Sequence, residues 1–316
     1  MKKFDIIALG ELNVDLLLNR ICGFPEIGKE IFAKEMTLTL GSSTAIFAAN
    51  AASLGARVSF LGMVGNDDFG AFVKNSLQKR GVDTSNLIEV STAATGLTAI
   101  LNYDEDRANV TYPGAMSIMG VKDIRPEAIA EAMHVHISSI FMQEALHRDI
   151  YEIVKLVKAQ GATLSMDMQF DPEERWDFDY AKILPLVDVF MPNEQELKGL
   201  TGQDSVEKAI ETVRPYINVL VVKMGSKGSL VVTKEGEKML PAMLNRNVVD
   251  AIGAGDSFNS GFITAYVQGK DLEYCQYLGN LTGAINTTAA GGTGAFSSKK
   301  AVEEAALKHF NQTIKL

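Results

Sequence analysis

The sequence has few of the residues that mark secreted or membrane proteins. Its 316 residues include only two cysteines, Cys22 and Cys275, far apart along the chain. Two such thiols are more often free in a cytosolic enzyme than paired in a disulfide. No apolar run approaches the ~20 residues of a membrane-spanning helix, and the short apolar stretch near the N-terminus, interrupted by Asp5, lacks a signal-peptide cleavage site. We therefore expect a soluble, cytoplasmic protein.

Positive charge is also scarce. The chain has 30 Lys and Arg residues against 39 Asp and Glu residues, which gives a formal net charge of −9. This balance provides no overall attraction to nucleic acids or to anionic membranes, so we expect neither among the partners. A local basic pocket for a phosphate group is still compatible with it.

Predicted strands and helices alternate along the chain, which indicates a layered α/β fold. Residues 4–9 and 57–64 are expected to be strands, and residues 45–54 and 67–80 helices that end at glycines. The remaining expected strands and helices are 134–140, 149–160, 162–166, 187–191, 194–200, 219–224 and much of the chain after Gly255.

Four short stretches look like the strands of two hairpins without covering helices: residues 14–18 with 31–40, and residues 95–103 with 107–112. A few strands without helices make a poor independent core. We therefore expect a small β lid, formed by segments about 12–40 and 95–114, that packs on the main domain or on a second subunit. Residues 1–316 are then a single α/β domain with a lid.

The segment DAIGAGDSFNSGF, residues 250–262, carries the most informative pattern. Gly253, Ala254 and Gly255 have almost no side chains, so a phosphate can approach their backbone closely. The small-residue helix that follows directs free N–H groups and its positive dipole end toward that point. Asp256 is suited to accept the proton of an attacking hydroxyl group there. Taken alone, a GxGD pattern is more often an ordinary N-cap behind glycines.

The longer pattern resembles the second signature of the PfkB, or ribokinase-like, family of carbohydrate kinases. The matching residues are Asp250, Gly253, Ala254, Gly255, Asp256, Ser260 and Gly261. The departure is Ala251, where the family usually has Thr, Ser, Val or Pro. The resemblance extends along nearly the whole chain. It implies a three-layer fold with a mostly parallel sheet, helices on both faces and a small β-sheet lid.

The resemblance also implies a reaction. The γ-phosphate of Mg-ATP passes to a hydroxymethyl group of a small sugar, with Asp256 as the catalytic base and residues 253–256 stabilising the developing charge. A homodimer formed through the lid is implied as well. The alternative from another class is a nucleotide- or sugar-binding regulator that kept the fold and lost catalysis.

GELNVD, residues 10–15, resembles the end of the family's first strand, which implies that Asn13 and Asp15 contact the sugar. An Asp at the carboxyl end of a strand is well placed to hold two hydroxyl groups. Without the resemblance, Asp15 is equally well read as a turn residue.

The family's first signature is matched less well. Gly41 and Ser42 are expected to bind substrate, although Ser42 stands where the family usually has its second glycine. Ile46 replaces the usual Asn, which removes one polar contact and favours a less hydroxylated partner or weaker substrate contacts. Ile100 belongs to the lid that is expected to close over the substrate.

The segment MDMQFDPEERW, residues 166–176, bears on the choice of substrate. Kinases of fructose and of 2-keto-3-deoxygluconate usually carry D-x-N-x-R here, and this chain has Asp167, Gln169 and Asp171. An Arg at the last position is suited to bind a substrate carboxylate, whereas Asp171 would repel one. We therefore favour a neutral substrate bound by Asp167 and Gln169, with a keto-deoxy acid sugar or a nucleoside as the alternative.

Two elements resemble the cation sites of the family. Asn193 and Glu196 match its N-x-x-E element, which implies a hydrated Mg²⁺ beside the ATP phosphates. The alternative is a capping box, which has the same spacing. Asp250 and the Gly291–Gly294 loop resemble a site for a monovalent cation such as K⁺.

The nucleotide contacts follow from two further resemblances. KMGSKGS, residues 223–229, is similar to the strand-turn-strand that covers the nucleotide, with Lys223, Gly225 and Gly228 as contacts, although a plain hairpin turn has the same residues. Asn280 matches the position that most often faces adenine.

Other kinase and cofactor motifs do not fit. No P-loop pattern occurs. The HRD at residues 147–149 lacks the Asn of protein kinases and is expected to be a helix start. His134 and His136 alternate along a strand without the neighbours of a zinc site.

Overall fold

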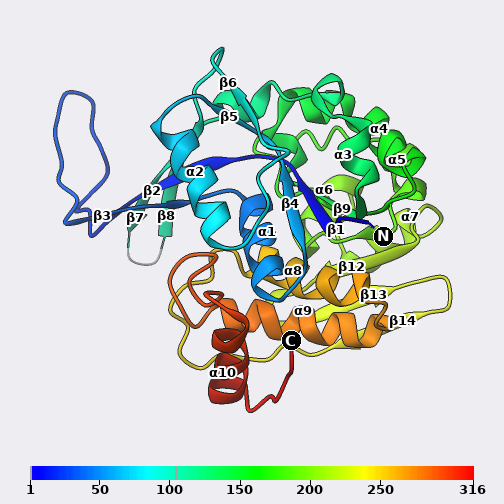
Figure 1. Cartoon of the computed structure of the whole chain (residues 1–316). Helices are drawn as coiled ribbons and strands as arrows, with labels where there is room; N and C mark the ends of the chain where they lie inside the picture. Colours follow the sequence, from blue (N-terminus) through cyan, green and yellow to red (C-terminus); the bar gives the residue numbers. More distant parts are fainter. Residues whose placement is uncertain (1, 104–105) are drawn as a thin grey trace.

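A computed structural model describes residues 2–103 and 106–316 of the chain. The strands of its main sheet are β1 (Phe4–Leu9), β4 (Val58–Leu61), β9 (Ala132–Ser138), β10 (Thr163–Asp167), β11 (Val189–Phe190), β12 (Val219–Lys223), β13 (Ser229–Val232) and β14 (Glu237–Leu240). They are ordered β14-β13-β12-β11-β10-β9-β1-β4 (Figure 1). The strands from β12 to β4 run parallel, whereas β13 pairs antiparallel with β12 and β14 pairs antiparallel with β13.

The predicted helices are present, one of them with a markedly earlier start, and three short helices that were not predicted lie at residues 126–130, 180–183 and 206–213. The expected helix over 149–160 begins earlier, at Glu144, because the chain turns at Gln143, whose carbonyl accepts the amide of His147. The HRD residues 147–149 therefore lie inside the helix and not at its start. The helices are α1 (Ser43–Ser53), α2 (Asp68–Lys79), α3 (Pro126–Ala130), α4 (Glu144–Ala159), α5 (Tyr180–Ile183), α6 (Glu194–Thr201), α7 (Val206–Val213), α8 (Ala254–Val267), α9 (Leu272–Asn286) and α10 (Lys299–Phe310).

The helices cover both faces of the main sheet. Helices α3 to α7 pack on one face in a core that contains Ile153 and Leu197. Helices α1, α2, α8, α9 and α10 pack on the other, in a core that contains Phe47 and Phe262. Burial on both sides explains why β1 is an almost continuous apolar run. The predicted three-layer α/β architecture is confirmed.

A second, smaller sheet comes from the two stretches predicted for the lid, and we call it the lid sheet. Its strands are β2 (Asn13–Asn19), β3 (Glu35–Leu40), β7 (Gly96–Tyr103) and β8 (Asp106–Tyr112), in the order β3-β2-β7-β8. It projects from the main body at the left of Figure 1. Strand β3 begins at Glu35 and not at residue 31, because its partner β2 ends at Asn19, opposite Glu35. Residues 104 and 105 of the predicted second hairpin lie outside the described residues.

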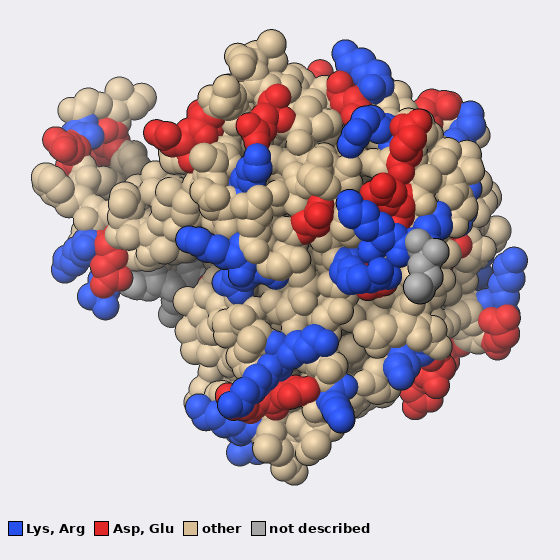
Figure 2. Space-filling model, in the orientation of Figure 1, with Lys and Arg blue, Asp and Glu red and all other residues tan. Residues whose placement is uncertain are grey.

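A short third sheet pairs β5 (Met63–Gly65) with β6 (Ile88–Val90). On the face shown in Figure 2, Lys and Arg side chains lie among Asp and Glu side chains, with no extended area of either sign. None of the helices in the described part of the chain has the length and apolar character needed to span a bilayer. Cys22 is exposed and Cys275 is buried, and both are free thiols.

Buried hydrogen bonds run in a continuous chain along β9 and β10. The ring nitrogens of His134 bond to Thr163 Oγ1 at 2.8 Å and to Ser165 Oγ at 2.7 Å. Those of His136 bond to Ser165 Oγ at 2.7 Å and to Ser138 Oγ at 2.9 Å. Burial lowers the pKa of both imidazoles, that of His136 to about 3. Both rings are therefore neutral in the folded protein near pH 7.

We expect His136 to make stability depend on pH. Below pH ~6.5, the ordinary pKa of histidine, the unfolded chain binds a proton here and the folded chain does not. The contribution of His136 to the free energy of unfolding is therefore complete above pH ~6.5. It decreases by about 1.4 kcal/mol per pH unit below that pH. Denaturant unfolding between pH ~7.5 and ~5.5 measures the effect.

Buried carboxyl groups with raised pKa values change stability in the opposite direction, so a matched variant is needed. We expect the stability difference between the wild type and His136→Gln to shrink as the pH falls. His309→Gln, which replaces an exposed histidine, is the control variant. A His136→Gln difference that does not change with pH would contradict the neutral, buried imidazole.

Candidate active site

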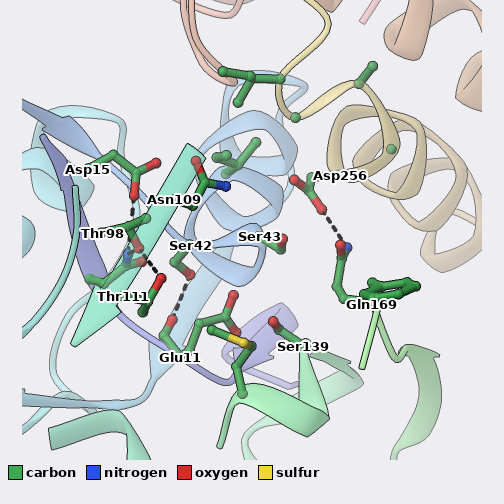
Figure 3. A pocket seen from close by; sticks show the side chains of 18 of the residues that line it. Glu11, Asp15, Ser42, Ser43, Thr98, Asn109, Thr111, Ser139, Gln169 and Asp256 are labelled. Carbon is green, nitrogen blue, oxygen red and sulfur yellow. Dashed lines mark hydrogen bonds between the residues drawn. The ribbon is translucent and has the colours of Figure 1, made fainter. Parts of the chain in front are cut away.

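A cavity of about 580 Å³ lies between the carboxyl ends of the central strands and the lid sheet. Glu11 enters it just after β1, Lys223 at the end of β12, and Asp256 from the first turn of α8. Ligand sites of open α/β sheets form at this edge, because side chains that follow neighbouring parallel strands converge there. Figure 3 shows the lid residues Asp15 and Thr98 on one side and Asp256 on the other.

The first turn of α8 has the predicted anion-binding geometry. Gly253 is the N-cap at φ 76°, and a Cβ on it would lie 2.6 Å from the Cα of Gly292, so only glycine fits. Among the described residues, the amides of Gly255 and Asp256 have no acceptor, whereas Ala254 N–H donates to the carbonyl of Ala251. Asp256 is the third residue of the helix, so the N-cap interpretation of GxGD is wrong.

Asp256 is buried and held by a hydrogen bond from Gln169, whose Nε2 donates to its Oδ1 at 3.1 Å. The Ser43 hydroxyl, in the first turn of α1, acts to lower the pKa of Asp256. Burial raises the pKa of Asp256 well above its usual value, and the charge of Asp167 raises it further. A carboxylate with a raised pKa is a stronger base, which suits it to take a proton from an alcohol.

Lys223 and Asp167 form an ion pair beneath the cavity. Lys223 Nζ lies 2.5 Å from Asp167 Oδ2, and Asn259 Nδ2 lies at the same distance from that oxygen. Burial acts to lower the pKa of Lys223, but the negative charges of Asp167 and Glu196 outweigh this effect. The net result is a raised pKa. The ammonium group also lies close to Gly255, 3.7 Å from where its Cβ would be. It is placed to meet an anion at the start of α8.

Asp167 itself differs from its predicted role as a substrate contact. Its carboxylate is fully buried and does not line the cavity, because it pairs with Lys223 below the surface. Gln169, predicted beside it, does line the cavity. Lys227, the other lysine of the segment 223–229, is exposed and pairs with Glu194 at 3.0 Å.

Asn13 and Asp15, which are predicted to contact the sugar, line the cavity on the lid side. Asn13 Nδ2 donates to Asp15 Oδ1 at 3.1 Å and to Thr98 Oγ1 at 2.9 Å. Burial raises the pKa of Asp15 to about 6, although Asn13 and the charge of Arg107 lower it in part. Gly41 does not line the cavity, but a Cβ on it would lie 2.3 Å from Asp15 Oδ1. It therefore makes room for that carboxylate.

Ser42 explains how the first signature can lose its second glycine. Its φ of 74° lies in the left-handed region that favours glycine. Two hydrogen bonds offset the strain, since its hydroxyl donates to the carbonyl of Glu11 at 2.7 Å and accepts the amide of Ala45 at 2.9 Å. Glu11 accepts the Thr44 hydroxyl at 2.6 Å, and burial raises the pKa of its carboxyl to about 7.

Apolar side chains form part of the cavity wall. Ile46, which replaces the family's usual Asn, lies against Gly253 and Gly292 at the start of α8. Ile100, the predicted lid contact, lines the cavity together with Met116. These side chains are almost fully buried. A hydroxyl group placed against them would find no hydrogen-bond partner.

Asn193 and Glu196 form the capping box given above as the alternative to a metal site. Asn193 Oδ1 accepts the amides of Gln195 and Glu196 at 2.9 Å, and Glu196 Oε2 accepts the amide of Asn193 at 2.8 Å. Burial raises the pKa of Glu196, and the charge of Asp167 adds to this. Both side chains also line the cavity. Since their oxygens already accept hydrogen bonds, they fit a hydrated Mg²⁺ held through water better than direct ligation.

Gly228, Asn280 and Asp250 lie away from the cavity wall, unlike Gly225, which lines it. Gly228 permits a turn at φ 111°, and a Cβ there would clash with the carbonyl of Leu240. Asn280 is buried, accepts the Ser229 hydroxyl and donates to the backbone between β14 and α8, so its amide is already used.

Asp250, predicted beside a monovalent cation, joins two loops directly. Its Oδ2 accepts the amide of Gly291 at 2.8 Å and its Oδ1 that of Ile252 at 2.9 Å. The two segments predicted to share the ion are thus brought together. Within the described residues, no group of three or more His, Cys, Asp or Glu side chains could hold a metal ion.

Asp171 does not have the position that the substrate argument assumed. Its carboxylate accepts the amides of Glu173 at 2.9 Å and Trp176 at 2.7 Å, and it does not line the cavity. It stabilises its own loop, so it cannot repel a bound carboxylate by direct contact. The prediction that Asp171 disfavours an acidic substrate is therefore wrong. A preference for a neutral substrate depends instead on the residues that line the cavity.

Several cavity residues are not among the predicted ones. Glu11 lies within GELNVD and Ser43 next to Ser42, but the resemblance implies no role for either. On β8 the signal was present as an alternation, since every second residue of that strand faces one side. The missed cavity residues from this strand are Asn109 and Thr111.

Comparison with known proteins gives a consistent result. A family model described as pfkB family carbohydrate kinase matches residues 3–299. An ATP-dependent ribose-1-phosphate kinase of Halopiger xanaduensis is 30% identical over 300 residues, which cover 94% of this chain and 95% of the relative. A ribokinase of Haemophilus influenzae is 26% identical and covers 93% of this chain and 96% of the relative.

Solved structures agree. A ribokinase of Thermotoga maritima matches with a TM-score of 0.83 and 26% identity, over 97% of this chain and all of its own (100%). A ribokinase of Arabidopsis thaliana, solved with ribose and ATP, matches with a TM-score of 0.81 and 24% identity, over 96% and 98% of the two chains. The predicted ribokinase-like fold is thus confirmed. Since the family model also spans nearly the whole sequence, the chain belongs to the pfkB family of carbohydrate kinases, phosphotransferases with an alcohol group as acceptor.

Proposed function

We propose that this chain transfers the γ-phosphoryl group of ATP to the hydroxymethyl group of a small neutral sugar of the ribose or fructose type. The observation that carries the proposal is the placement of Asp256. Its buried carboxylate lies in the first turn of α8, beside two amides that have no acceptor in the described part of the chain, and faces a cavity bounded by the lid sheet. A base and an electropositive backbone at one point are what phosphoryl transfer to an alcohol needs.

Each group has a separate task in the proposed reaction. Asn13 and Asp15 hold hydroxyl groups of the sugar and orient it. Asp256 takes the proton of the attacking hydroxyl. The amides of Gly255 and Asp256 stabilise the charge that develops on the phosphoryl group, and Lys223 adds a positive charge beside them. Closure of the lid excludes water, which otherwise competes as the acceptor.

The nucleotide is proposed to lie along the turn between β12 and β13. Gly225 allows its phosphates to approach, and Asn193 and Glu196 hold a hydrated Mg²⁺ through water. This ion supplies neutralisation of charge on the phosphate oxygens when it is bound. That a K⁺ ion binds beside Asp250 stays a prediction. The location of the protein in the cytoplasm also stays a prediction.

The charges of the cavity support a neutral sugar. Four acidic side chains line it, Glu11, Asp15, Glu196 and Asp256, against the basic Arg107 and Lys223. A carboxylate on the substrate would oppose ionisation of these carboxyl groups, including that of the proposed base Asp256. The apolar wall at Ile46 favours an acceptor with few hydroxyl groups on the side that faces it.

A substrate screen tests the proposal. ADP release is measured with Mg-ATP and ribose, 2-deoxyribose, fructose, a nucleoside or 2-keto-3-deoxygluconate. We expect the highest kcat/KM with a neutral sugar. A clear preference for 2-keto-3-deoxygluconate would contradict the proposal that the substrate is neutral. A preference for the nucleoside would contradict the proposal that the substrate is a sugar. Tight ligand binding without turnover of any alcohol would favour the non-catalytic regulator.

We also propose a homodimer formed through the lid sheet. One side of this sheet lines the cavity, and the other is apolar and open to solvent. Met36 on β3 is 68% exposed, and Val110 and Tyr112 on β8 are 67% and 54% exposed. These strands are the two edges of the sheet. A second copy of the chain, with the same apolar face, is the partner that we propose covers it.

The dimer makes a definite prediction. Light scattering after gel filtration should give twice the chain mass of 34.2 kDa, and Val110→Glu should give the mass of one chain, because it places charge in the proposed contact. Leu307→Glu, on the exposed side of α10, is the control and should leave the mass unchanged. A monomeric wild type, or a Val110→Glu variant that is still dimeric, would contradict the contact.

A further inference from the structure

Gln169 joins the two buried carboxylates at the centre of the site. Its Nε2 donates to Asp167 Oδ2 and to Asp256 Oδ1, each at 3.1 Å. Figure 3 shows Gln169 and Asp256 facing each other across this hydrogen bond. The amide nitrogen therefore uses both of its hydrogens between two carboxylates. This arrangement differs from the substrate contact that the sequence predicts for Gln169.

The backbone of Gln169 is held in an unusual conformation. Its φ is 62°, in the left-handed region that glycine prefers. Non-glycine residues in this region persist where their surroundings hold them, and they concentrate at functional sites. Here Asp167 Oδ1 accepts the backbone amide of Gln169 at 3.4 Å, and the ring of Phe170 lies edge-on to Trp176 at 5.4 Å. The residue is thus fixed on both sides.

Its anchor is also fixed. Asp167 is fully buried and accepts hydrogen bonds from Lys223 and Asn259, at the end of β12 and within α8. Two elements, β12 and α8, therefore hold Asp167 at the end of β10, and Asp167 holds Gln169. A displacement of Gln169 would require this buried network to change.

We propose that Gln169 is a positioning residue for Asp256: it holds one carboxylate oxygen and so directs the group at the acceptor alcohol. This inference rests on the proposed function. A donor to a carboxylate also stabilises its ionised form. Without Gln169, Asp256 should therefore take up a proton at higher pH. The charged groups that act on Asp256 from neighbouring elements are Asp167, Lys223 and Glu11, and a change at Gln169 leaves all three in place.

The test compares Gln169→Ala and Gln169→Gly with the wild type. Glycine accepts a φ of 62° without strain, so this variant keeps the loop even if the alanine variant does not fold. We expect kcat to fall roughly tenfold or more in either folded variant, with KM for ATP within about twofold of the wild type. The acidic limb of the kcat–pH profile should move to higher pH.

Gln268→Ala, at the exposed far end of α8, is the matched control and should behave like the wild type. Folded Gln169 variants with an unchanged kcat and pH profile would overturn the inference. So would a rise in KM for ATP with an unchanged pH profile, which would place Gln169 on the nucleotide. A wild type that phosphorylates no alcohol would instead count against the proposed function.

Discussion

Asp256→Asn is expected to lower kcat by at least about 100-fold while the affinity for ATP stays within about twofold. Asparagine has the shape of aspartate but cannot take the proton of the attacking hydroxyl. The substitution also removes a buried negative charge next to Asp167, so the folded protein should lose no stability. Steady-state ADP release gives kcat, and calorimetric titration of ATP gives the affinity.

Asp204→Asn is the control for this prediction, since it makes the same chemical change at an exposed position between α6 and α7. It should keep the wild-type kcat. An Asp256→Asn variant that is as active as the wild type would contradict the assignment of the base. A variant that fails only because ATP no longer binds would assign Asp256 to nucleotide binding.

Lys223→Met is expected to lower the free energy of unfolding by about 3–5 kcal/mol. The substitution leaves Asp167 buried without its counter-ion, because that carboxylate has no exposed surface. The desolvation cost of the unpaired charge is then no longer offset. The same change should lower kcat, since it removes the positive charge beside the start of α8. Urea unfolding followed by circular dichroism measures the stability.

Two further variants separate the causes. The double variant Lys223→Met/Asp167→Asn removes the unpaired charge and should recover most of the lost stability, but not the activity. Lys227→Met, four residues along the chain, breaks an exposed pair with Glu194 and should cost less than about 1 kcal/mol. If Lys223→Met and Lys227→Met lowered the free energy of unfolding equally, burial of the ion pair between Lys223 and Asp167 would not account for its contribution to stability.

Much of the fold could be predicted from local patterns. The apolar run of β1 and the small-residue helix α1 each carry their signal within a few neighbouring residues. The start of α8 could be predicted in the same way, because its glycines indicate both where the helix begins and that a phosphate can approach the backbone there. The two stretches without covering helices likewise indicated the lid sheet, whose strands pair as expected.

The side-chain contacts could not be predicted in the same way. Asp167 and Lys223 are 56 positions apart, and only the strand order brings the ends of β10 and β12 to one edge. Asp171 was interpreted from its position in a motif, yet the turn that follows it determines where its carboxylate points. Such contacts depend on the tertiary fold, which cannot be inferred from the spacing of residues along the sequence.

The central claim is that the groups around Asp256 transfer phosphate from ATP to a hydroxymethyl group. Proton-coupled phosphorus NMR of the product formed from Mg-ATP and the best acceptor of the screen tests it most directly. We predict a phosphomonoester signal split by two equivalent or nearly equivalent protons, as a –CH₂–O–phosphate group requires. A signal split by a single proton, or inorganic phosphate as the only product besides ADP, would contradict the account.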